Sequence, residues 1–567
     1  MGLIGQAARR LSVGRLPSAS LRRSIASMPP VVDTIYAPAT AAGRAGVAVI
    51  RMSGPLSKQI LELLTPGTGV PPPRQMAVRS LRDPTTGELV DRGLVAFFPG
   101  PGSFTGEDIA EFHVHGGPAV VEGLLSALSN AGQNLAPPAS ASAGAAGGRV
   151  RWALPGEFTR RSFHNGKLDL TQAEGLADLL AANTQAQRRQ ALRLAGGAAR
   201  RAATAWRGSI SRALAHLEAL IDFADDNDFA EQETLSVAAD ALAAIVEDME
   251  FRLSRSHCGA LIRDGLRVSL VGSPNAGKSS LLNAIAEREV SIVSPFAGTT
   301  RDIVEAPLSL GGFALLVSDT AGLRSAPPSG GSDGHDLDPV EREGIRRAQA
   351  KIADAHLRLA VIDAQAFLAR SELDPLVAAQ ITGDTLVAFN KVDLLPAADG
   401  DPMAVADAQR HMLASRLEAA LAEHGSHPAA SLPEVETNLF LVSCTTRLGV
   451  DALADALTSA VRGVLSSEGP AAGQSGRSGF DSDDDVAAPD DDGRSVILSH
   501  PRHRDYVSRA VSHLKVALAH LSPGGTQDAV LVAEECRAAA HALAGLAGKL
   551  APDDVLDIVF AEFCIGK

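Results

Sequence analysis

The chain has 567 residues and a mass of 58.6 kDa, a length that predicts about three or four domains. With 45% hydrophobic and 21% charged residues, its composition excludes fibrous and wholly disordered proteins. The formal charge of −14 excludes a uniformly basic nucleic-acid binder, and without a run of about 20 apolar residues we expect no membrane insertion.

Residues 1–32 have the composition of a targeting segment rather than of a folded domain. They contain five arginines and several serines, whereas the first carboxylate of the chain is Asp33. This pattern is typical of a mitochondrial transit peptide, with a basic disordered tail as the alternative. We therefore exclude residues 1–32 from the fold and expect the protein in the mitochondrial matrix.

Residues 33–165 predict a small α+β domain. Short apolar runs between turn signals indicate strands at 47–51, 93–98 and 110–115, and residues 118–129 indicate a helix. Residues 137–148 are limited to Pro, Ala, Ser and Gly and predict a low-complexity insertion.

The rest of the chain predicts an α/β domain set within a helical one. Residues 166–264 have a helical apolar period and form the first part of a helical bundle domain. Residues 265–465 alternate strand-like and helical segments, as doubly wound domains do, with strands at 267–271, 314–317, 357–362, 386–389 and 439–442. Residues 466–494, with seven aspartates between Asp481 and Asp492, predict a disordered acidic linker. Residues 495–567 predict the second part of the helical domain.

A phosphate-binding loop is the clearest motif. The sequence GSPNAGKS at 272–279 follows a strand and opens a helix, as the motif GxxxxGK[ST] requires. Its backbone N–H groups can surround phosphates, the Lys278 ammonium can reach the β- and γ-oxygens, and the Ser279 hydroxyl can bind Mg²⁺. We assign the loop to Asn275, Ala276, Gly277, Lys278, Ser279 and Ser280, and count Lys278 among the catalytic residues.

Two further segments predict the γ-phosphate side of a Ras-like G domain. In DTAG at 319–322, Asp319 would hold Mg²⁺ through water and the Gly322 N–H would contact the γ-phosphate. Thr299 and Thr300 precede the second strand, and Thr300 is the expected Mg²⁺ ligand. The position after DTAG is Leu323, which cannot orient water, so catalysis must come from another group.

The nucleotide base is expected to be guanine. In NKVD at 390–393, after Asn390 and Lys391, the Asp393 carboxylate can accept both N1–H and N2–H of guanine. Adenine would leave that carboxylate unpaired, a mismatch that discriminates by about 10⁴–10⁵. Ser443 and Cys444, after another strand, fit the loop that packs on the base. Asn275 offers an amide oxygen for a second, monovalent cation near the phosphates.

These motifs and several others resemble the MnmE (TrmE) family of tRNA wobble-uridine modification GTPases. The others are FTGED at 104–108, HGGP at 115–118, PGEFTR at 155–160, NGKLDL at 165–170, QAEGLAD at 172–178 and the terminal CIGK. The resemblance implies a folate-binding-like N-terminal domain, a homodimer and K⁺-activated hydrolysis. It also implies an FAD-containing partner, MnmG (GidA), and C5 modification of uridine 34 with a tetrahydrofolate donor in the 5,10-methylene or 5-formyl form.

The resemblance also implies roles for single residues. Potassium would be held by Asn275, Ser294, Phe296 and Thr299, and Glu341 would position the attacking water. Residues 325–338 depart from the family by an insertion between DTAGLR and VER. Folate would contact Arg51, Glu111, Lys167 and Lys567, because a carboxylate accepts from the pterin donors and cations pair with the glutamate tail.

The four cysteines are widely spaced, which favours a reducing compartment. Of these, Cys564 near the end of the chain has two open interpretations, a catalytic thiol near the folate or a buried structural cysteine. A prenylation signal is disfavoured because the chain ends in Lys567.

A basic stretch suggests where mitochondrial tRNA binds. Between Asp178 and Glu218 there is no acid, while the stretch holds Arg188, Arg189, Arg193, Arg200, Arg201, Arg207 and Arg212. Alternatively, these arginines form a solvated helix face or a face that binds the partner protein. If they bind tRNA, four residues further along the chain could add to the same surface: Arg502, Arg504, Arg509 and Lys515.

Two other functions compete with K⁺-dependent, folate-using tRNA modification. An Era-type ribosome-assembly GTPase would need an RNA-binding domain after the G domain, and no KH-like GxxG loop follows residue 495. A pure regulator, with all modification chemistry in the partner, is the third possibility.

Overall fold

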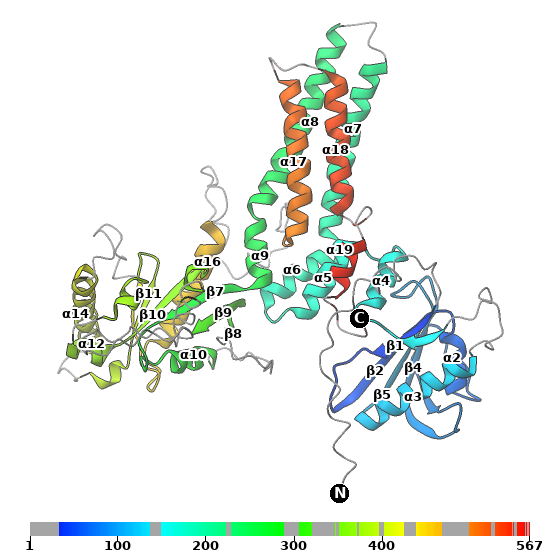
Figure 1. The fold of residues 1–567 in the computed structure, drawn as a ribbon, viewed down its shortest axis with the longest axis horizontal. Coiled ribbons are helices and arrows are strands. Elements are labelled where there is room, and N and C mark those ends of the chain that lie inside the picture. The colour runs from blue at the N-terminus through cyan, green and yellow to red at the C-terminus, as the bar shows by residue number, and fades with distance from the viewer. Residues whose placement is uncertain are drawn as a thin grey trace, which may run out of the picture. The chain divides into compact units, whose positions relative to one another are not determined.

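A computed structural model gives the fold, and it describes most of the chain (Figure 1). The described residues are 33–135, 149–222, 228–287, 305–319, 346, 351–370, 373–395, 402–423, 438–467, 498–522, 528–546, 548, 553–561, 563 and 566. The expected transit peptide, the insertion at 137–148 and residues 468–494 of the predicted linker lie outside them, whereas residues 466 and 467 end the last helix of the α/β domain. The chain divides into two compact units, one reaching Ala177 and including the residues after Leu546, the other Asp178–Leu546.

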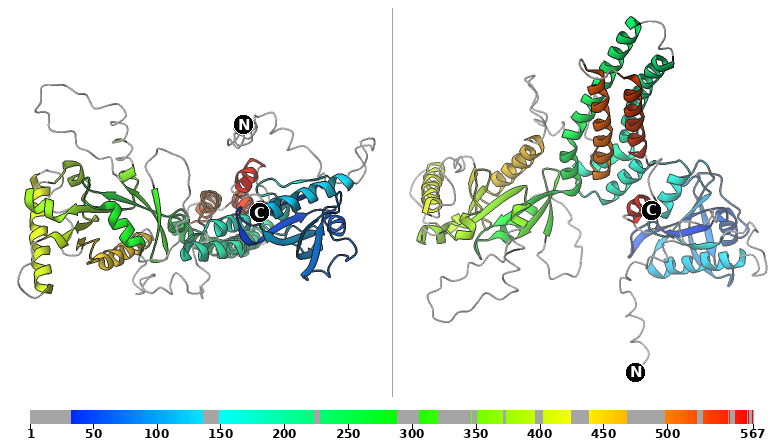
Figure 2. Two further views of the ribbon diagram at one scale, coloured as in Figure 1. Left: turned by 90° about the horizontal axis from the view of Figure 1, so that it is seen from below. Right: turned by 45° about the horizontal axis from the view of Figure 1, so that its top comes forward.

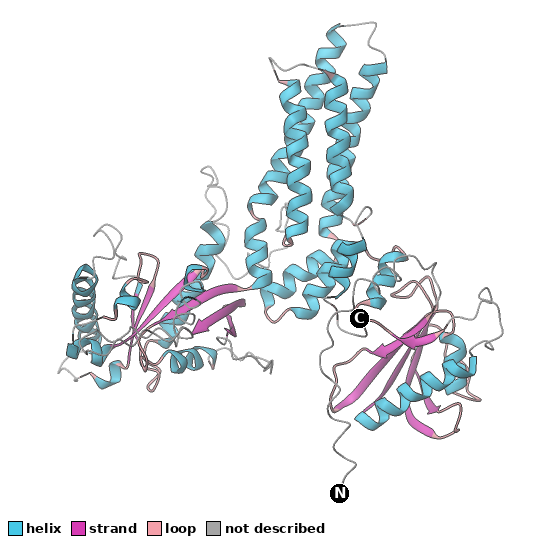
Figure 3. Ribbon diagram, in the orientation of Figure 1, coloured by secondary structure: helices cyan, strands magenta, loops and turns pink. Residues whose placement is uncertain are grey.

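The first unit is built on a six-stranded sheet with the order β3-β4-β5-β2-β1-β6. Its strands are β1 (Thr34–Pro38), β2 (Ala45–Ser53), β3 (Ala77–Arg82), β4 (Leu89–Phe98), β5 (Ile109–Gly116) and β6 (Val150–Trp152). The helices α2 (Ser57–Leu64) and α3 (Pro118–Leu135) pack on one face around Ile50, Phe112 and Leu124 (Figure 3). The three strands and the helix expected from the sequence are present, and β1, β3, β6 and α2 are additional.

Three short helices contribute to this unit: α4 (Glu157–His164), α5 (Leu170–Ala181), of which residues 170–177 belong to it, and the C-terminal α19 (Asp553–Ala561). Leu170 and Ala173 of α5 share an apolar cluster with Leu556, Val559 and Phe560 of α19. The sequence grouped all of residues 495–567 with the helical domain. In the structure α19 belongs to the same compact unit as the N-terminal sheet, and its apolar face packs on α5.

The helical part of the second unit is a bundle (Figures 1 and 2). It comprises α6 (Gln185–Ala195), α7 (Ala198–Asp222), α8 (Asp228–Ser254), α9 (Ser256–Asp264), α17 (Pro501–Leu521) and α18 (Ala529–Leu546). Residues from α7, α8, α17 and α18 fill one core that contains Trp206, Leu242, Leu514 and Cys536. The two helical blocks, separated in sequence by the α/β domain, therefore fold together.

The α/β domain is doubly wound, with the strand order β12-β11-β10-β7-β9-β8. The strands are β7 (Leu266–Val271), β8 (Glu305–Leu310), β9 (Phe313–Asp319), β10 (Leu357–Asp363), β11 (Leu386–Asn390) and β12 (Leu439–Leu441). All neighbours are parallel except the β8–β9 hairpin. The carboxyl ends of β7, β10 and β11 therefore meet at one edge, where the nucleotide motifs lie.

Helices cover both faces of this sheet. Residues of α10 (Lys278–Ala286) and α16 (Val450–Ser467) contribute to the core on one face. Those of α12 (Ala364–Arg370), α13 (Pro375–Ala378) and α14 (Pro402–Glu423) contribute to the core on the other. Within the described residues, no helix combines the length and apolar character that crossing a bilayer demands.

Candidate functional site

The loop after β7 has the backbone conformation that a phosphate requires. Gly272 approaches the Val361 carbonyl of β10 so closely that a Cβ there would collide with it. Asn275 and Gly277 have φ of 63° and 92°, so the loop curls back before α10 begins at Lys278. Such a curl at a helix N-terminus directs backbone N–H groups and the positive end of the helix dipole toward an anion.

Lys278 is buried over this loop. Its Nζ donates hydrogen bonds to the carbonyls of Gly272 and Ser273, at 2.8 and 3.1 Å. These bonds hold the ammonium at the loop, where a nucleotide's phosphates would lie. Ser279 and Ser280 follow on the first turn of α10 and are exposed, as a hydroxyl that must reach Mg²⁺ should be. The residues present therefore fit GTP with Mg²⁺.

The base-binding segment is tied to the phosphate loop by Asn390. This side chain is buried, and its Nδ2 donates to the Ala276 carbonyl at 2.9 Å. A Cβ at Gly277 would collide with the same amide group, which explains why the loop needs glycine there. The Cys444 thiol donates to Asn390 Oδ1 at 3.4 Å. Asn390 therefore joins three of the motifs that the sequence analysis singled out.

Lys391 has a partner that the sequence did not reveal. It adopts φ of 63°, and its Nζ lies 2.7 Å from Asp363 Oδ2 at the end of β10. Burial opposes ionisation of Asp363, but the hydrogen bonds from Lys391 and from the Ala366 N–H lower the pKa of this carboxyl overall. Asp363 thus orients Lys391, while the neighbouring Asp393 is exposed and accessible to a base.

The loop around Cys444 is braced by Arg447. Ser443 is buried and accepts the Thr446 N–H at 3.1 Å. Arg447 donates to the Ala284 carbonyl at 2.9 Å and forms an ion pair with Glu287, so it joins this loop to the C-terminus of α10. Burial, together with the charge of Asp393, raises the pKa of the Cys444 thiol, which keeps it protonated at neutral pH.

The γ-phosphate side of the site is only partly described. Asp319 is the last residue of β9, the position expected for it. Ser294, Phe296, Thr299, Thr300, Gly322 and Glu341 lie outside the described residues, as does the insertion at 325–338.

In the first unit, two of the expected folate ligands pair with each other. Arg51 of β2 and Glu111 of β5 are register partners, and Arg51 Nη2 lies 2.9 Å from Glu111 Oε1. The Arg51 guanidinium also lies 5.6 Å from the centre of the Phe104 ring. The second oxygen, Glu111 Oε2, is 3.4 Å from His113 Nε2. The sequence placed both residues in one site but did not predict their ion pair.

The remaining expected folate residues are less constrained. Lys167 is exposed, and its Nζ donates to the Pro101 carbonyl at 3.0 Å. This bond brings Lys167 to the loop that carries Phe104. Lys567 and Cys564 lie outside the described residues.

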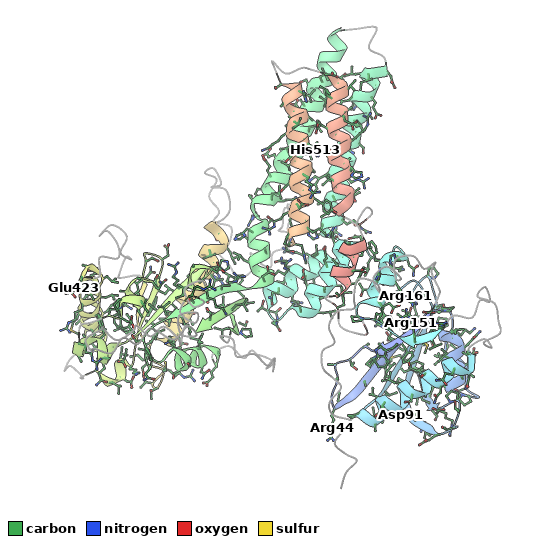
Figure 4. All side chains as sticks on the ribbon, in the orientation of Figure 1. Arg44, Asp91, Arg151, Arg161, Glu423 and His513 are labelled. Carbon is green, nitrogen blue, oxygen red and sulfur yellow. The ribbon has the colours of Figure 1, made fainter. Side chains whose placement is uncertain are left out.

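Several residues of the FTGED and PGEFTR motifs stabilise the fold around this site. Glu107 accepts hydrogen bonds from Ser53 Oγ at 2.7 Å and from Arg161 Nη1 at 2.9 Å. Arg151 of β6 makes a bidentate ion pair with Glu157, in which Nη1 donates to Oε2 at 2.8 Å and Nη2 to Oε1 at 2.7 Å. Arg151 and Arg161 are labelled in Figure 4. Burial raises the pKa of Glu157, but the hydrogen bonds from Arg151 and the Leu154 N–H lower it by more, so the pKa is lowered overall.

Comparison with known proteins agrees with this geometry. A sequence profile described as "GTP-binding protein TrmE N-terminus" matches residues 34–167, and one described as "MnmE helical domain" matches residues 170–564. The "tRNA modification GTPase MnmE" of Rhodospirillum rubrum is 41% identical over 554 residues, covering 94% of this chain and 100% of that protein. The chain belongs to the MnmE family.

Two animal members of the MnmE family are also similar over nearly their full length. Both are named "5-taurinomethyluridine-[tRNA] synthase subunit GTPB3, mitochondrial". The Danio rerio protein is 37% identical over 579 residues, with 100% of each chain covered. The Homo sapiens protein is 38% identical over 559 residues, with 96% of each covered. The resemblance drawn from the motifs is confirmed, and the protein is a GTPase that binds GTP.

Proposed function

We propose that this protein is a K⁺-activated GTPase that modifies C5 of uridine 34 in mitochondrial tRNAs. It would act in the mitochondrial matrix with an FAD-containing, MnmG-type partner and a tetrahydrofolate one-carbon donor. The observation that carries the proposal is the Asn390 hydrogen bond joining the guanine motif to the phosphate loop, in a chain that matches MnmE-family members from end to end. Those relatives are named for tRNA modification rather than for ribosome assembly.

Asn275 supports the potassium part of the proposal. It is exposed, with a left-handed backbone, within the loop that surrounds the phosphates. An amide oxygen there is a suitable ligand for a monovalent cation, which would supply positive charge where negative charge develops during hydrolysis. Ser294, Phe296 and Thr299 are the proposed further ligands. Glu341 is proposed to position the water, a role that Leu323 cannot perform.

The Arg51–Glu111 pair supports the folate part. A carboxylate has about four acceptor positions, so Glu111 can hold Arg51 through Oε1 and still accept pterin donors. Arg51, only partly buried, retains donors for the glutamate tail. Lys167 and Lys567 would add positive charge for that tail. Cys564 is proposed as the thiol that serves the uridine chemistry, with a structural role as the alternative.

Exposed apolar residues on the face of the N-terminal sheet opposite α2 and α3 support a homodimer. The helices α2 and α3 cover one face only, and Val78 of β3 and Leu94 of β4 are register partners on the other. Both are exposed, as is Val47 on β2. A second copy of the chain would bury this apolar surface.

The deciding experiment is nucleoside mass spectrometry of mitochondrial tRNA from cells that lack the protein. Rescue is attempted with the wild type, with Lys278→Ala, and with Lys58→Ala as a control from the exposed surface of α2. We expect the C5 group to be lost from wobble uridines and restored by the wild type and Lys58→Ala only. Unchanged wobble uridines in the cells without the protein would refute the proposal.

A further inference from the structure

Five arginines on α6 and α7 have no carboxylate partner within the part of the chain that the structure describes. We call Arg188, Arg189, Arg201, Arg207 and Arg212 the basic face. The partners of three of them are neutral: Arg188 donates to Gln185 Oε1, Arg201 to the Gly196 carbonyl and Arg212 to Ser209 Oγ. Among the contacts of the described residues, none joins a carboxylate to a member of the basic face.

On α7 the arginines of the basic face flank a row of small residues on the side of the helix that points away from the core. Ala203, Trp206 and Ile210 are buried, so they fix which side of α7 faces the core. At about 3.6 residues per turn, the opposite side carries Thr204, Gly208 and Ser211 between the arginines. Gly208 lies beside Arg212, since a Cβ there would be 3.8 Å from Arg212 Nη1, an ordinary contact distance.

Four other cations of the bundle already have hydrogen-bond or ion-pair partners. Lys515 lies 2.6 Å from Glu250, and Arg509 lies 2.7 Å from Asp505. Arg537 pairs with both Glu218 and Glu534. Arg502 donates to the carbonyls of Gly545 and Leu546, where α18 ends. Among the described residues of the bundle, arginines without a carboxylate partner are therefore most numerous on α6 and α7, in a chain whose formal charge is −14.

We propose that the basic face binds the phosphate backbone of the tRNA, an inference that rests on the proposed function. Arginine is suited to this because its planar guanidinium can donate two parallel hydrogen bonds to one phosphate. From Arg201 to Arg212 the helix rises roughly 16 Å, long enough to face several successive phosphates of one strand. Trp206, the one Phe, Tyr or Trp of α7, is buried, so this face offers no large aromatic side chain for stacking on bases.

The test measures tRNA affinity as a function of salt. Unmodified mitochondrial tRNA is titrated with the full-length wild type, with Arg201→Gln/Arg212→Gln and with the control Arg537→Gln, at several KCl concentrations. We expect the double variant to bind at least about tenfold more weakly and to lose about 1.5–2 from the slope of log affinity against log salt. The control, an exposed arginine with two acidic partners, should match the wild type. Basal GTP hydrolysis and the melting temperature should not change in either variant.

The possible failures can be told apart. If the double variant keeps wild-type affinity and slope, the basic face does not bind tRNA. If it keeps tRNA affinity but no longer restores wobble modification in rescued cells, the face serves an acidic protein partner, and the inference is likewise wrong. Failure of the proposed function itself would appear as unchanged wobble uridines in cells that lack the protein.

Discussion

The nucleotide site and the Arg51–Glu111 site are built in different ways. The phosphate loop binds through the backbone of consecutive residues, and its conformation depends on Asn275 and Gly277 within the loop. The N-terminal site depends on two side chains that are distant in sequence and meet through strand register. In the phosphate loop, the spacing of the motif residues along the sequence is enough to predict how they are arranged. In the N-terminal pair, the fold creates the geometry, and the two charges neutralise each other.

The largest effect is expected at Asp393. In Asp393→Asn the amide should accept from N1–H and donate to a carbonyl at position 2, so xanthine replaces guanine as the preferred base. We expect the ratio of GTP to XTP affinity to fall on the order of 10⁴-fold. Competition binding with the two nucleotides measures it. A variant that simply lost both nucleotides would show that the exposed carboxylate acts on loop structure rather than on the base.

The second-largest effect is expected for Lys278→Ala. Removing the ammonium held at Gly272 and Ser273 should lower the rate of GTP hydrolysis by about 10²–10³-fold, since a positioned positive charge acts on the transferred phosphate. Single-turnover hydrolysis at saturating GTP is the measurement, with Lys58→Ala as the matched control. Near-normal hydrolysis would show that the site does not depend on this charge.

The Arg151–Glu157 pair tests how the N-terminal fold is maintained. Because the folded-state pKa of Glu157 is lowered, its contribution is fully present above the unfolded value of about 4.3 and is lost as pH falls through the folded value. Glu157→Gln should lower the free energy of unfolding by about 1.5–3 kcal/mol at pH 7. Denaturant unfolding from pH 7 down to pH 3 should show the difference shrinking. A difference independent of pH would assign the effect to packing.

The smallest effect is expected at Arg51. Arg51→Gln removes the ion pair with Glu111 and one cation for folate, so we expect about tenfold weaker binding of a tetrahydrofolate derivative. Calorimetric titration of the wild type, Arg51→Gln, Glu111→Gln and the double variant gives the coupling between the two residues. Additive effects would mean that the pair does not act as one site.

The sequence predicted features that are set by short-range patterns. The five strands of the α/β domain predicted from apolar runs are all present, because buried parallel strands are continuous apolar segments. It missed β6, a three-residue strand that pairs in parallel with β1 far away in sequence. It also missed Asp363 and Arg447, since only the fold brings Asp363 to Lys391 and Arg447 to the end of α10. Long-range partners of this kind leave no local signal.

The pairing of α7 and α8 with α17 and α18 has a consequence for synthesis on the ribosome. The apolar sides of the first two helices emerge early, but the helices that cover them follow only after the whole α/β domain. At about 5–20 residues per second, the intervening stretch of roughly 250 residues takes between about ten and fifty seconds to translate. During that interval the apolar sides of α7 and α8 remain exposed on the nascent chain. This is the stage of synthesis at which a chaperone would be needed most.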